Sequence, residues 1–200
     1  ERRGSRELTA APPVLYAQTS GTGGQPKVVP LTEAGIARVA RAQRLFALSV
    51  HRGTAMFRGQ IVGIGSPAVE GHLPGGHPVG SASGLVYEGM PSLIRRKYVL
   101  DPEVLAIAEH ELRYRVIAAL AAAEPRVSSI ATANPSTLVR LRSVMVEVWP
   151  ELVATVRTGR LPWADQLDPG TRAVVAERLR PDRDRADALA RRRRARARRR

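Results

Sequence analysis

The sequence contains no cysteine and few aromatic residues. Among its 200 residues, Phe, Trp and Tyr together account for only 4%. The lack of cysteine excludes a disulfide scaffold, a thiolate metal site and a cysteine nucleophile. Because aromatic side chains are scarce, the core has to be built from Leu, Val, Ile and Ala. Apolar residues make up 44% of the chain, which is typical of a folded globular protein.

The sequence also lacks an apolar stretch long enough to span a bilayer. The longest one, residues 116–123, is far shorter than the roughly 20 residues that a membrane-spanning helix needs. The first residues, ERRGSRELTAAPP, are charged and show no apolar segment of the kind found in signal peptides. We therefore expect a cytoplasmic protein without a membrane partner.

Basic residues are abundant, but they are concentrated at one end. The formal net charge is +14, and the last ten residues, RRRRARARRR, hold eight arginines. Subtracting those eight charges leaves +6, a moderate excess. Only Lys27 and Lys97 are lysines, and such a preference for arginine often reflects codon composition. A terminal block without interleaved aromatic residues favours a solvated tail over a specific nucleic-acid surface.

Local signals predict an α/β protein in which strands are separated by helices. Strands are expected at residues 14–20, 27–31, 59–65 and 126–132. Thr32 is expected to cap a helix starting at Glu33. Other expected helix starts combine a capping residue with a proline, namely Asp101-Pro102, Asn134-Pro135, Asp168-Pro169 and Pro181-Asp182.

The same signals predict where helices are interrupted. The segment after Asp101 reaches Ala123 either as one helix or as two helices joined near Glu111. Pro150 is expected to break or kink the helix that begins after Asn134, and Gly159 to end that region. Residues 66–89 are rich in Gly, Pro and Ser, and we expect a long functional or mobile loop there.

The first expected helix has distinct faces. Four apolar residues fall near one face, and three arginines lie largely on others: Ile36, Val39, Ala40 and Phe46 against Arg38, Arg41 and Arg44. Arg38 and Arg41 are candidates for pairing with a substrate carboxylate, because a guanidinium can bind a carboxylate through two hydrogen bonds. The alternative is that they are ordinary surface charges of an amphipathic helix.

The stretch QTSGTGGQPKVVP, residues 18–30, places hydroxyl side chains among glycines and then Pro26 and Lys27. Hydroxyls and backbone N–H groups in a tight loop suit a polyphosphate. A Walker loop needs Gly-Lys-Ser/Thr, but here Pro26 precedes the lysine and no hydroxyl follows it. A dinucleotide-binding loop opens a helix, whereas PKVVP is expected to be extended. An ordinary Gly/Ser/Thr hairpin stays open as an alternative.

The pattern Thr-Ser-Gly-Thr-x-Gly-x-Pro-Lys between two short strands resembles the phosphate loop of acyl-adenylate-forming enzymes. In their chemistry a carboxylate attacks the α-phosphate of ATP, and the loop holds the departing β- and γ-phosphates. The resemblance implies a set of phosphate-binding residues, namely Thr19, Ser20, Gly21, Thr22, Gly23, Gly24 and Lys27. Lys27 can equally be a solvated charge at the end of a strand.

Four longer motifs follow the loop in order: SPAVEGHLPGGHPVGSASG (66–84), MPSLIRRKYVLDPEVLAI (90–107), ELRYRVIAALAAAEPRVSSIATANPSTLVRL (111–141) and LRPDRDRADAL (179–189). Together they resemble a bacterial member of the Gretchen Hagen auxin-responsive promoter family, the acyl-acid amido synthetases. The resemblance implies an α/β fold, part of an adenylating N-terminal domain with a mixed sheet and packed helices. It also implies ATP and Mg²⁺ as cofactors, and a small carboxylic acid and an amino acid as substrates.

The chain departs from this family in three respects. Residue 23 is Gly where the family pattern usually has Ser or Thr, the family's enzymes are more than twice as long, and an arginine-rich end has no counterpart in them. We therefore expect a connector over residues 1–13, a partial adenylation domain over 14–190 and a disordered tail over 191–200. We also expect a truncated or frameshifted product that is inactive alone.

Two further possibilities concern metal and polyanion binding. His72 and His77 lie five residues apart with Glu70 nearby, but no third ligand of fixed spacing accompanies them, so we expect no metal site there. No residue is assigned as catalytic. The alternative function is that of a non-catalytic basic protein, which binds nucleic acid or another polyanion through its arginine tail.

Overall fold

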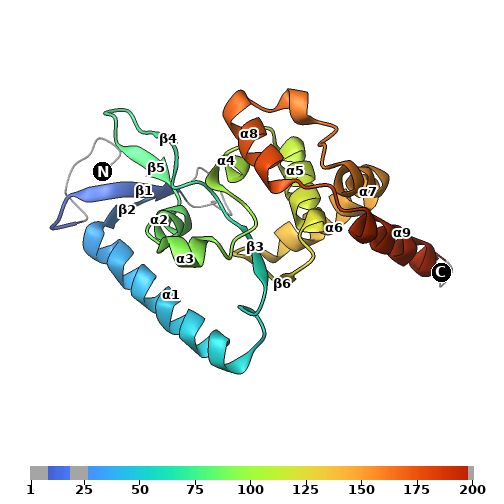
Figure 1. Cartoon of the computed structure of the whole chain (residues 1–200). Helices are drawn as coiled ribbons and strands as arrows, with labels where there is room; N and C mark the ends of the chain where they lie inside the picture. The colour runs from blue at the N-terminus through green and yellow to red at the C-terminus, as the bar shows by residue number, and fades with distance from the viewer. Residues whose placement is uncertain (1–8, 19–26, 198–200) are drawn as a thin grey trace. The chain divides into compact units, whose positions relative to one another are not determined.

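The computed structural model of the chain describes residues 9–18 and 27–197, and the side chains of its last helix up to Arg192 (Figure 1). It divides into two compact units. Unit 1 comprises Glu1–Met56 and Gly65–Arg96, and unit 2 comprises Phe57–Ile64 and Lys97–Arg200. The domain expected over residues 14–190 thus spans parts of both units.

Unit 1 contains a mixed sheet of four strands in the order β2-β1-β5-β4. The strands are β1 (Pro13–Gln18), β2 (Val28–Thr32), β4 (Val69–His72) and β5 (Pro78–Gly80). β1 pairs antiparallel with β2 and parallel with β5, and β5 pairs antiparallel with β4. Leu15 and Tyr16 of the inner strand β1 are buried. The first strand pair and the mixed sheet are therefore confirmed.

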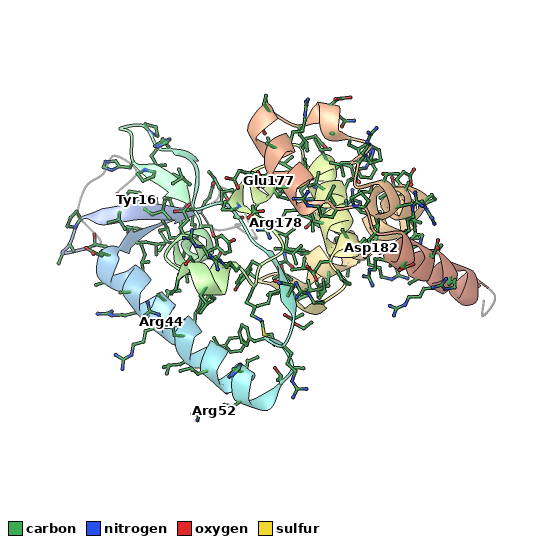
Figure 2. All side chains as sticks on the ribbon, in the orientation of Figure 1. Tyr16, Arg44, Arg52, Glu177, Arg178 and Asp182 are labelled. Atoms are coloured by element: carbon green, nitrogen blue, oxygen red, sulfur yellow. The ribbon has the colours of Figure 1, made fainter. Side chains whose placement is uncertain are left out.

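The described residues of unit 1 also form three helices, α1 (Glu33–Gly53), α2 (Ala82–Glu88) and α3 (Ser92–Arg95). The predicted cap of α1 is confirmed, because the Thr32 hydroxyl accepts a hydrogen bond from the N–H of Gly35 at 3.2 Å. α1 has no buried residue, although it is 21 residues long. Arg44 and Arg52 extend from it (Figure 2). Apolar periodicity predicted the helix correctly, but not how little of its surface unit 1 covers.

The expectation of a long loop over residues 66–89 is wrong. This segment contains β4, β5 and α2. Gly75 and Gly76 form the turn between the two strands with φ values of 104° and 81°, a region that favours glycine. A Cβ at Gly80 would lie 2.0 Å from the carbonyl oxygen of Ala68, so the close strand approach also requires glycine. The glycines that suggested a loop therefore serve a tight hairpin.

Unit 2 is mostly helical and has one parallel strand pair, β3 (Gln60–Ile64) and β6 (Val127–Thr132). Its helices are α4 (Pro102–Leu105), α5 (His110–Ala123), α6 (Pro135–Glu147), α7 (Trp149–Thr158), the 3-10 helix η1 (Ala164–Gln166), α8 (Pro169–Arg178) and α9 (Arg183–Ala197). The predicted strands and helix starts in this unit are confirmed. The segment after Asp101 forms two helices, α4 and α5, rather than one continuous helix; two helices was one of the two predicted alternatives.

The core of unit 2 surrounds α5. A run of five consecutive residues, from Val116 to Leu120, is buried, so this helix is enclosed on several sides. The predicted interruption near Pro150 lies at Val148, between α6 and α7, and Gly159 ends α7 with φ 70°. Buried side chains from α6 to α9 complete the core: Leu141, Val144, Leu152, Val156, Val175, Ala186 and Leu189.

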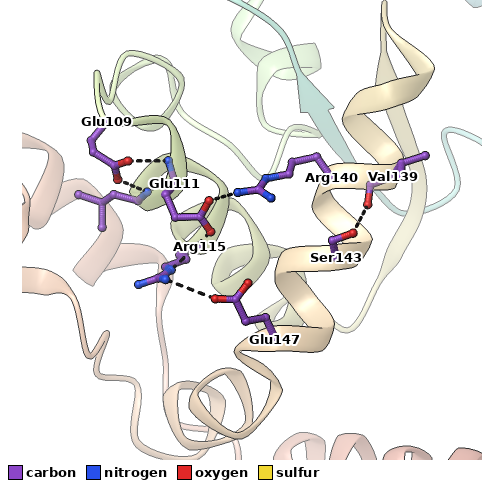
Figure 3. A network of polar contacts seen from close by, with 8 residues as sticks. Glu109, Glu111, Arg115, Val139, Arg140, Ser143 and Glu147 are labelled. Carbon is purple, nitrogen blue, oxygen red and sulfur yellow. Dashed lines mark hydrogen bonds and ion pairs between the residues drawn. The ribbon is translucent and has the colours of Figure 1, made fainter.

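A network of charged side chains joins α5 to α6 (Figure 3). Glu111 forms ion pairs with Arg140 and, at 3.7 Å, with Arg115. Arg115 also lies 3.5 Å from Glu147 and above the ring of Trp163. Since these groups are partly exposed, each pair contributes little to stability by itself. The ion pairs of Glu111 with Arg140 and of Arg115 with Glu147 link the two helices.

At the end of the chain, α9 continues as helix to Ala197. The expected arginine-rich tail, residues 191–200, therefore overlaps the last turns of this helix, and residues 198–200 lie outside the described part. In the residues that the structure describes, no helix is both long and apolar enough to cross a membrane.

Candidate functional site

The predicted phosphate loop connects two paired strands. Gln18 at the end of β1 pairs with Val28 at the start of β2, so the loop closes an antiparallel hairpin. The structure thus confirms two adjacent strands with no helix starting at Lys27. Six of the predicted phosphate-binding residues lie outside the described residues: Thr19, Ser20, Gly21, Thr22, Gly23 and Gly24. Their role stays a prediction.

Lys27 is the one predicted phosphate-binding residue that the structure describes. It is exposed and lies directly before β2, in extended rather than helical chain. The first helix after the loop starts only at Glu33. A Walker loop leads straight into a helix, whose N-terminus helps to bind phosphate. The observed strand therefore excludes the Walker arrangement and agrees with the extended PKVVP segment.

Sequence reasoning missed two serines near the end of β1. β1 and β5 run parallel, with Ala17 opposite Gly80, so both strands end at the same edge of the sheet. The loop follows β1 there, and Ser81 follows β5. Ser81 accepts a hydrogen bond from the N–H of Gly84, and its hydroxyl lies 2.6 Å from that of Ser83. The sequence Ser-Ala-Ser after Gly80 was a visible signal, but only the parallel pairing shows that it follows a strand lying beside the end of β1.

The two histidines considered as metal ligands lie on the β4–β5 hairpin. His77 contacts the buried ring of Tyr16 edge-on, with 5.8 Å between ring centroids. His72 is exposed at the end of β4 and pairs with Pro78. In the part of the chain that the structure describes, no group of three His, Cys, Asp or Glu side chains could hold a metal ion. His77 has a packing role against β1.

The two candidate acid-binding arginines lie on α1. Arg38 and Arg41 are exposed and three residues apart, so they project from neighbouring turns of one side of the helix. No ion pair is formed by either within the described residues. Their guanidinium groups are thus available to an anion. Whether that anion is an acyl-acid substrate stays a prediction.

Carboxylates with shifted pKa values lie in unit 2 and serve its structure. The backbone N–H groups of Leu112 and Glu111 lower the pKa of Glu109, which caps α5. The hydroxyl and N–H of Thr171 lower the pKa of Asp168, which caps α8. A hydrogen bond from Arg157 lowers the pKa of Asp187, and burial raises the pKa of Tyr98. Capping and surface pairing account for the three carboxylates, so none of them marks a catalytic group.

The described residues beside the predicted phosphate loop, and the sequence of that loop, differ in the ligands they suit. Lys27 is exposed and follows a segment whose sequence contains three hydroxyl side chains and three glycines. Such a loop can donate several hydrogen bonds to phosphate oxygens. For Mg²⁺, however, the described residues present no cluster of carboxylates, and we assign it no ligand.

Comparison with protein families decides the family. The profile described as "GH3 family N-terminal domain" matches residues 3–199, almost the whole chain. The chain belongs to the GH3 family. This is the family that the sequence motifs resemble, so the resemblance is confirmed. A search of curated proteins finds no match.

Solved GH3 structures share the fold. The chain superposes on the structure of a "GH3.15 acyl acid amido synthetase" with a TM-score of 0.77 and 18% sequence identity, over 94% of this chain and 34% of that one. A second structure, "AtGH3.15 acyl acid amido synthetase in complex with 2,4-DB", gives a TM-score of 0.72 and 21% identity over 88% and 32%. The chain spans about a third of the length of these GH3 structures. The predicted fold class, α/β with a mixed sheet and packed helices, is confirmed, and it corresponds to the GH3 family N-terminal domain.

Proposed function

We propose that residues 19–27 form the phosphate-binding loop of an ATP-dependent ligase that activates a small carboxylic acid. The β1–β2 hairpin carries this proposal, because it presents the Thr-Ser-Gly-Thr run and Lys27 between two short strands. Membership of the GH3 family supports the same chemistry. It favours an acyl-acid amido synthetase over a Walker-type nucleotidase.

In the proposed reaction, an oxygen of the substrate carboxylate attacks the α-phosphorus of ATP, and the bond to the β-phosphate breaks. Pyrophosphate leaves as the acyl-adenylate forms, and the amine of an amino acid then attacks the acyl carbon and displaces AMP. Thr19, Ser20 and Thr22 would donate hydrogen bonds to the departing phosphates, and Lys27 would offset their charge. Mg²⁺, when bound with ATP, would neutralise further phosphate charge.

The substrates are proposed by class only. A small carboxylic acid is supported by one of the solved relatives, an acyl acid amido synthetase in complex with 2,4-DB. Arg38 and Arg41 are the candidate partners of the acid's carboxylate, because they are exposed on the helix that follows the hairpin. We propose an amino acid as the second substrate, and neither a nucleic acid nor a membrane as a specific partner.

Nucleotide binding by the 200-residue chain tests the loop. We expect weak, saturable binding of ATP, measured by calorimetry. Thr22→Ala or Lys27→Ala should weaken it about tenfold or more, since each removes a hydrogen bond to a charged group worth roughly 1.5–3 kcal/mol. Lys97→Ala is the matched control, because Lys97 is the other lysine and hydrogen-bonds to the carbonyl of Phe57 in unit 2. Equal affinities for all four proteins would contradict the proposal.

Acid-dependent exchange of pyrophosphate into ATP tests activity. The loop holds only the outer phosphates, whereas adenylation also requires the adenosine and the α-phosphate to be positioned. This chain spans about a third of its solved relatives, so we expect no exchange from it alone. A full-length relative should show exchange that falls when its counterparts of Ser20 and Thr22 are replaced by Ala. Robust turnover by the 200-residue chain would mean that it contains a complete site.

A further inference from the structure

The surface of unit 2 carries a cleft of about 560 Å³, lined by the C-terminal ends of α5 and α8 and by the start of α9. This volume lies within the range of small-molecule sites, roughly 300–1,000 Å³. The apolar part of the lining consists of Ala123, Pro125 and Pro181, and the other lining residues are three arginines and two aspartates. Because charged side chains dominate its walls, the cleft suits a small charged ligand rather than an apolar one.

Hydrogen bonds fix the start of α9 against the rest of unit 2. The backbone N–H of Asp182 donates to the carbonyl oxygen of Val156 in α7 at 2.8 Å. The Nε of Arg185 donates to the carbonyl oxygen of Ala122 in α5 at 3.1 Å. The wall that α9 contributes is therefore in place before a ligand binds, which reduces the entropic cost of binding.

Two of the five charged side chains in the cleft serve its structure. Arg178 donates two hydrogen bonds to the carboxylate of Asp101, from Nε at 2.8 Å and from Nη2 at 2.7 Å. Asp182 caps α9, because its Oδ1 accepts a hydrogen bond from the N–H of Arg185 at 2.8 Å. Figure 2 labels Arg178 and Asp182. Neither of these two side chains is needed to explain a ligand.

The other three charged side chains of the cleft are Arg180, Arg183 and Asp184. Each is exposed, and none forms an ion pair within the residues that the structure describes. A single unpaired arginine is ordinary on a protein surface. Here, however, two free cations and one free anion line the same cleft, so the charges that a complementary ligand has to carry are specified.

The matching ligand carries two carboxylates and one ammonium group. A guanidinium binds a carboxylate through two parallel hydrogen bonds, so Arg180 and Arg183 each suit one carboxylate. Asp184 suits the ammonium group, which the partial negative charge at the C-terminal ends of α5 and α8 also favours. Phosphate or another simple anion matches the arginines, but it also brings negative charge close to Asp184.

We propose that this cleft binds a free acidic α-amino acid, with its carboxylates on Arg180 and Arg183 and its ammonium group on Asp184. Glutamate and aspartate belong to this class. The proposal goes beyond the proposed function, because it concerns unit 2 and requires neither ATP nor the predicted phosphate loop. Binding is weak, since exposed ion pairs each contribute little.

The test is an NMR titration of the ¹⁵N-labelled 200-residue chain with L-glutamate, without nucleotide. Because the chain is strongly basic, backbone amide shifts are measured, which report where an anion binds. We expect saturable shifts at the amides of Arg180, Arg183 and Asp184. Glutarate, which lacks the ammonium group, and L-glutamine, which lacks one carboxylate, should each bind about threefold more weakly or worse. Absence of saturable shifts there, or equal affinity for glutamate, glutarate and inorganic phosphate, would overturn the proposal.

Variants at the three free side chains separate the two charges of the ligand. Arg180→Ala with Arg183→Ala should weaken glutamate about fivefold or more, whereas Asp184→Asn should weaken glutamate but not glutarate. Arg142→Ala is the matched control, because Arg142 is an exposed arginine of α6 outside the cleft, with no ion pair among the described residues. It should bind glutamate like the parent. Equal losses for the control and the double variant would overturn the proposal.

Two measurements distinguish loss of this site from general damage. Thermal unfolding of the variants should match that of the parent, because the replaced side chains are exposed. ATP binding should also be unchanged, because the predicted phosphate loop belongs to unit 1. Weaker ATP binding or a large loss of stability in the double variant would show that its arginines maintain the fold, against the proposal. Failure of the chain to bind ATP would leave the glutamate result unaffected.

Discussion

The two units of this chain differ in what holds them together. Among the described residues, unit 1 buries only Leu15, Tyr16 and Ala68 of its apolar side chains, whereas unit 2 has a continuous core around α5. Yet every predicted ligand-binding residue, from Thr19 to Arg41, belongs to unit 1. The part that carries the candidate site is therefore the part with little core of its own, as is common for segments that act on ligands.

The largest effect is expected from the core of unit 2. Leu120→Ala removes a buried side chain of α5 and leaves a cavity, which should lower the free energy of unfolding by about 2–5 kcal/mol. Urea unfolding followed by circular dichroism measures it. Leu93→Ala is the control, because the same truncation at an exposed position of unit 1 should cost little. If Leu120→Ala and Leu93→Ala lowered the free energy of unfolding by similar amounts, the contrast between the core of unit 2 and the surface of unit 1 would be wrong.

A smaller and local effect is expected in unit 1. Gly80→Ala would bring a Cβ to 2.0 Å from the Ala68 carbonyl oxygen, so the β4–β5 pairing should be destabilised by about 1–3 kcal/mol. Hydrogen exchange should accelerate in β1, β4 and β5 but not in α5. Gly71→Ala is the matched control, since a Cβ there meets nothing within 4 Å. Faster exchange throughout α5 would show that the units do not respond separately.

Acid should weaken unit 2 through its lowered carboxyl pKa values. The hydrogen bond from Arg157 to Asp187, 2.5 Å long, lowers the pKa of this aspartate. The stabilisation from ionised Asp187 is therefore fully present above the pKa of about 4 that an aspartate has in the unfolded chain. It is lost as pH falls through the lower pKa that Asp187 has in the folded chain. The loss of stability between pH 5 and 3 should be smaller in Asp187→Asn than in the parent, by urea unfolding. Glu177 is an exposed acid with no ion pair among the described residues, so Glu177→Gln should lose as much stability between pH 5 and 3 as the parent does. If Asp187→Asn also loses as much as the parent, the pair of Arg157 with Asp187 contributes nothing and the prediction is wrong.

The smallest effect on stability is expected from removing the arginine-rich end. Residues 191–200 contain no apolar side chain beyond Ala195 and Ala197, and their like charges repel one another. Deleting them should change the free energy of unfolding by less than about 0.5 kcal/mol. The deletion should also abolish salt-sensitive binding of the chain to polyanions. A large loss of stability would show that this end is docked on an acidic surface.

Much of the fold could be predicted because its signals are local. The Thr32 hydroxyl caps α1, Asn134 caps α6 by accepting from the N–H of Ser136, and Gly159 ends α7 in a left-handed conformation. Each of these depends on a few neighbouring residues, so the sequence pattern suffices. The prediction of a long loop over residues 66–89 was wrong because β5 pairs with β1, more than fifty residues earlier, and β4 in turn pairs with β5.

The candidate site divides in the same way. Residue types alone predicted a strand, a hydroxyl- and glycine-rich loop and a second strand, and β1 and β2 confirm that hairpin. The loop residues themselves, 19–24, stay a prediction. Ser81 and Ser83 could not be placed near the end of β1 from the sequence, because only the parallel pairing of β1 with β5 brings the ends of these strands to one edge.

By itself, the sequence determined the caps, the breaks, most strands and the family motifs, because these depend on residue chemistry within a few positions. Only the tertiary structure decided which apolar side chains are covered. Both α5 and α1 contain large apolar side chains of the kind that form cores. The run Val116–Leu120 of α5 is buried, whereas Phe46 of α1 is 62% exposed. Burial depends on which distant elements are present to pack against a helix, and local hydrophobicity does not specify those neighbours.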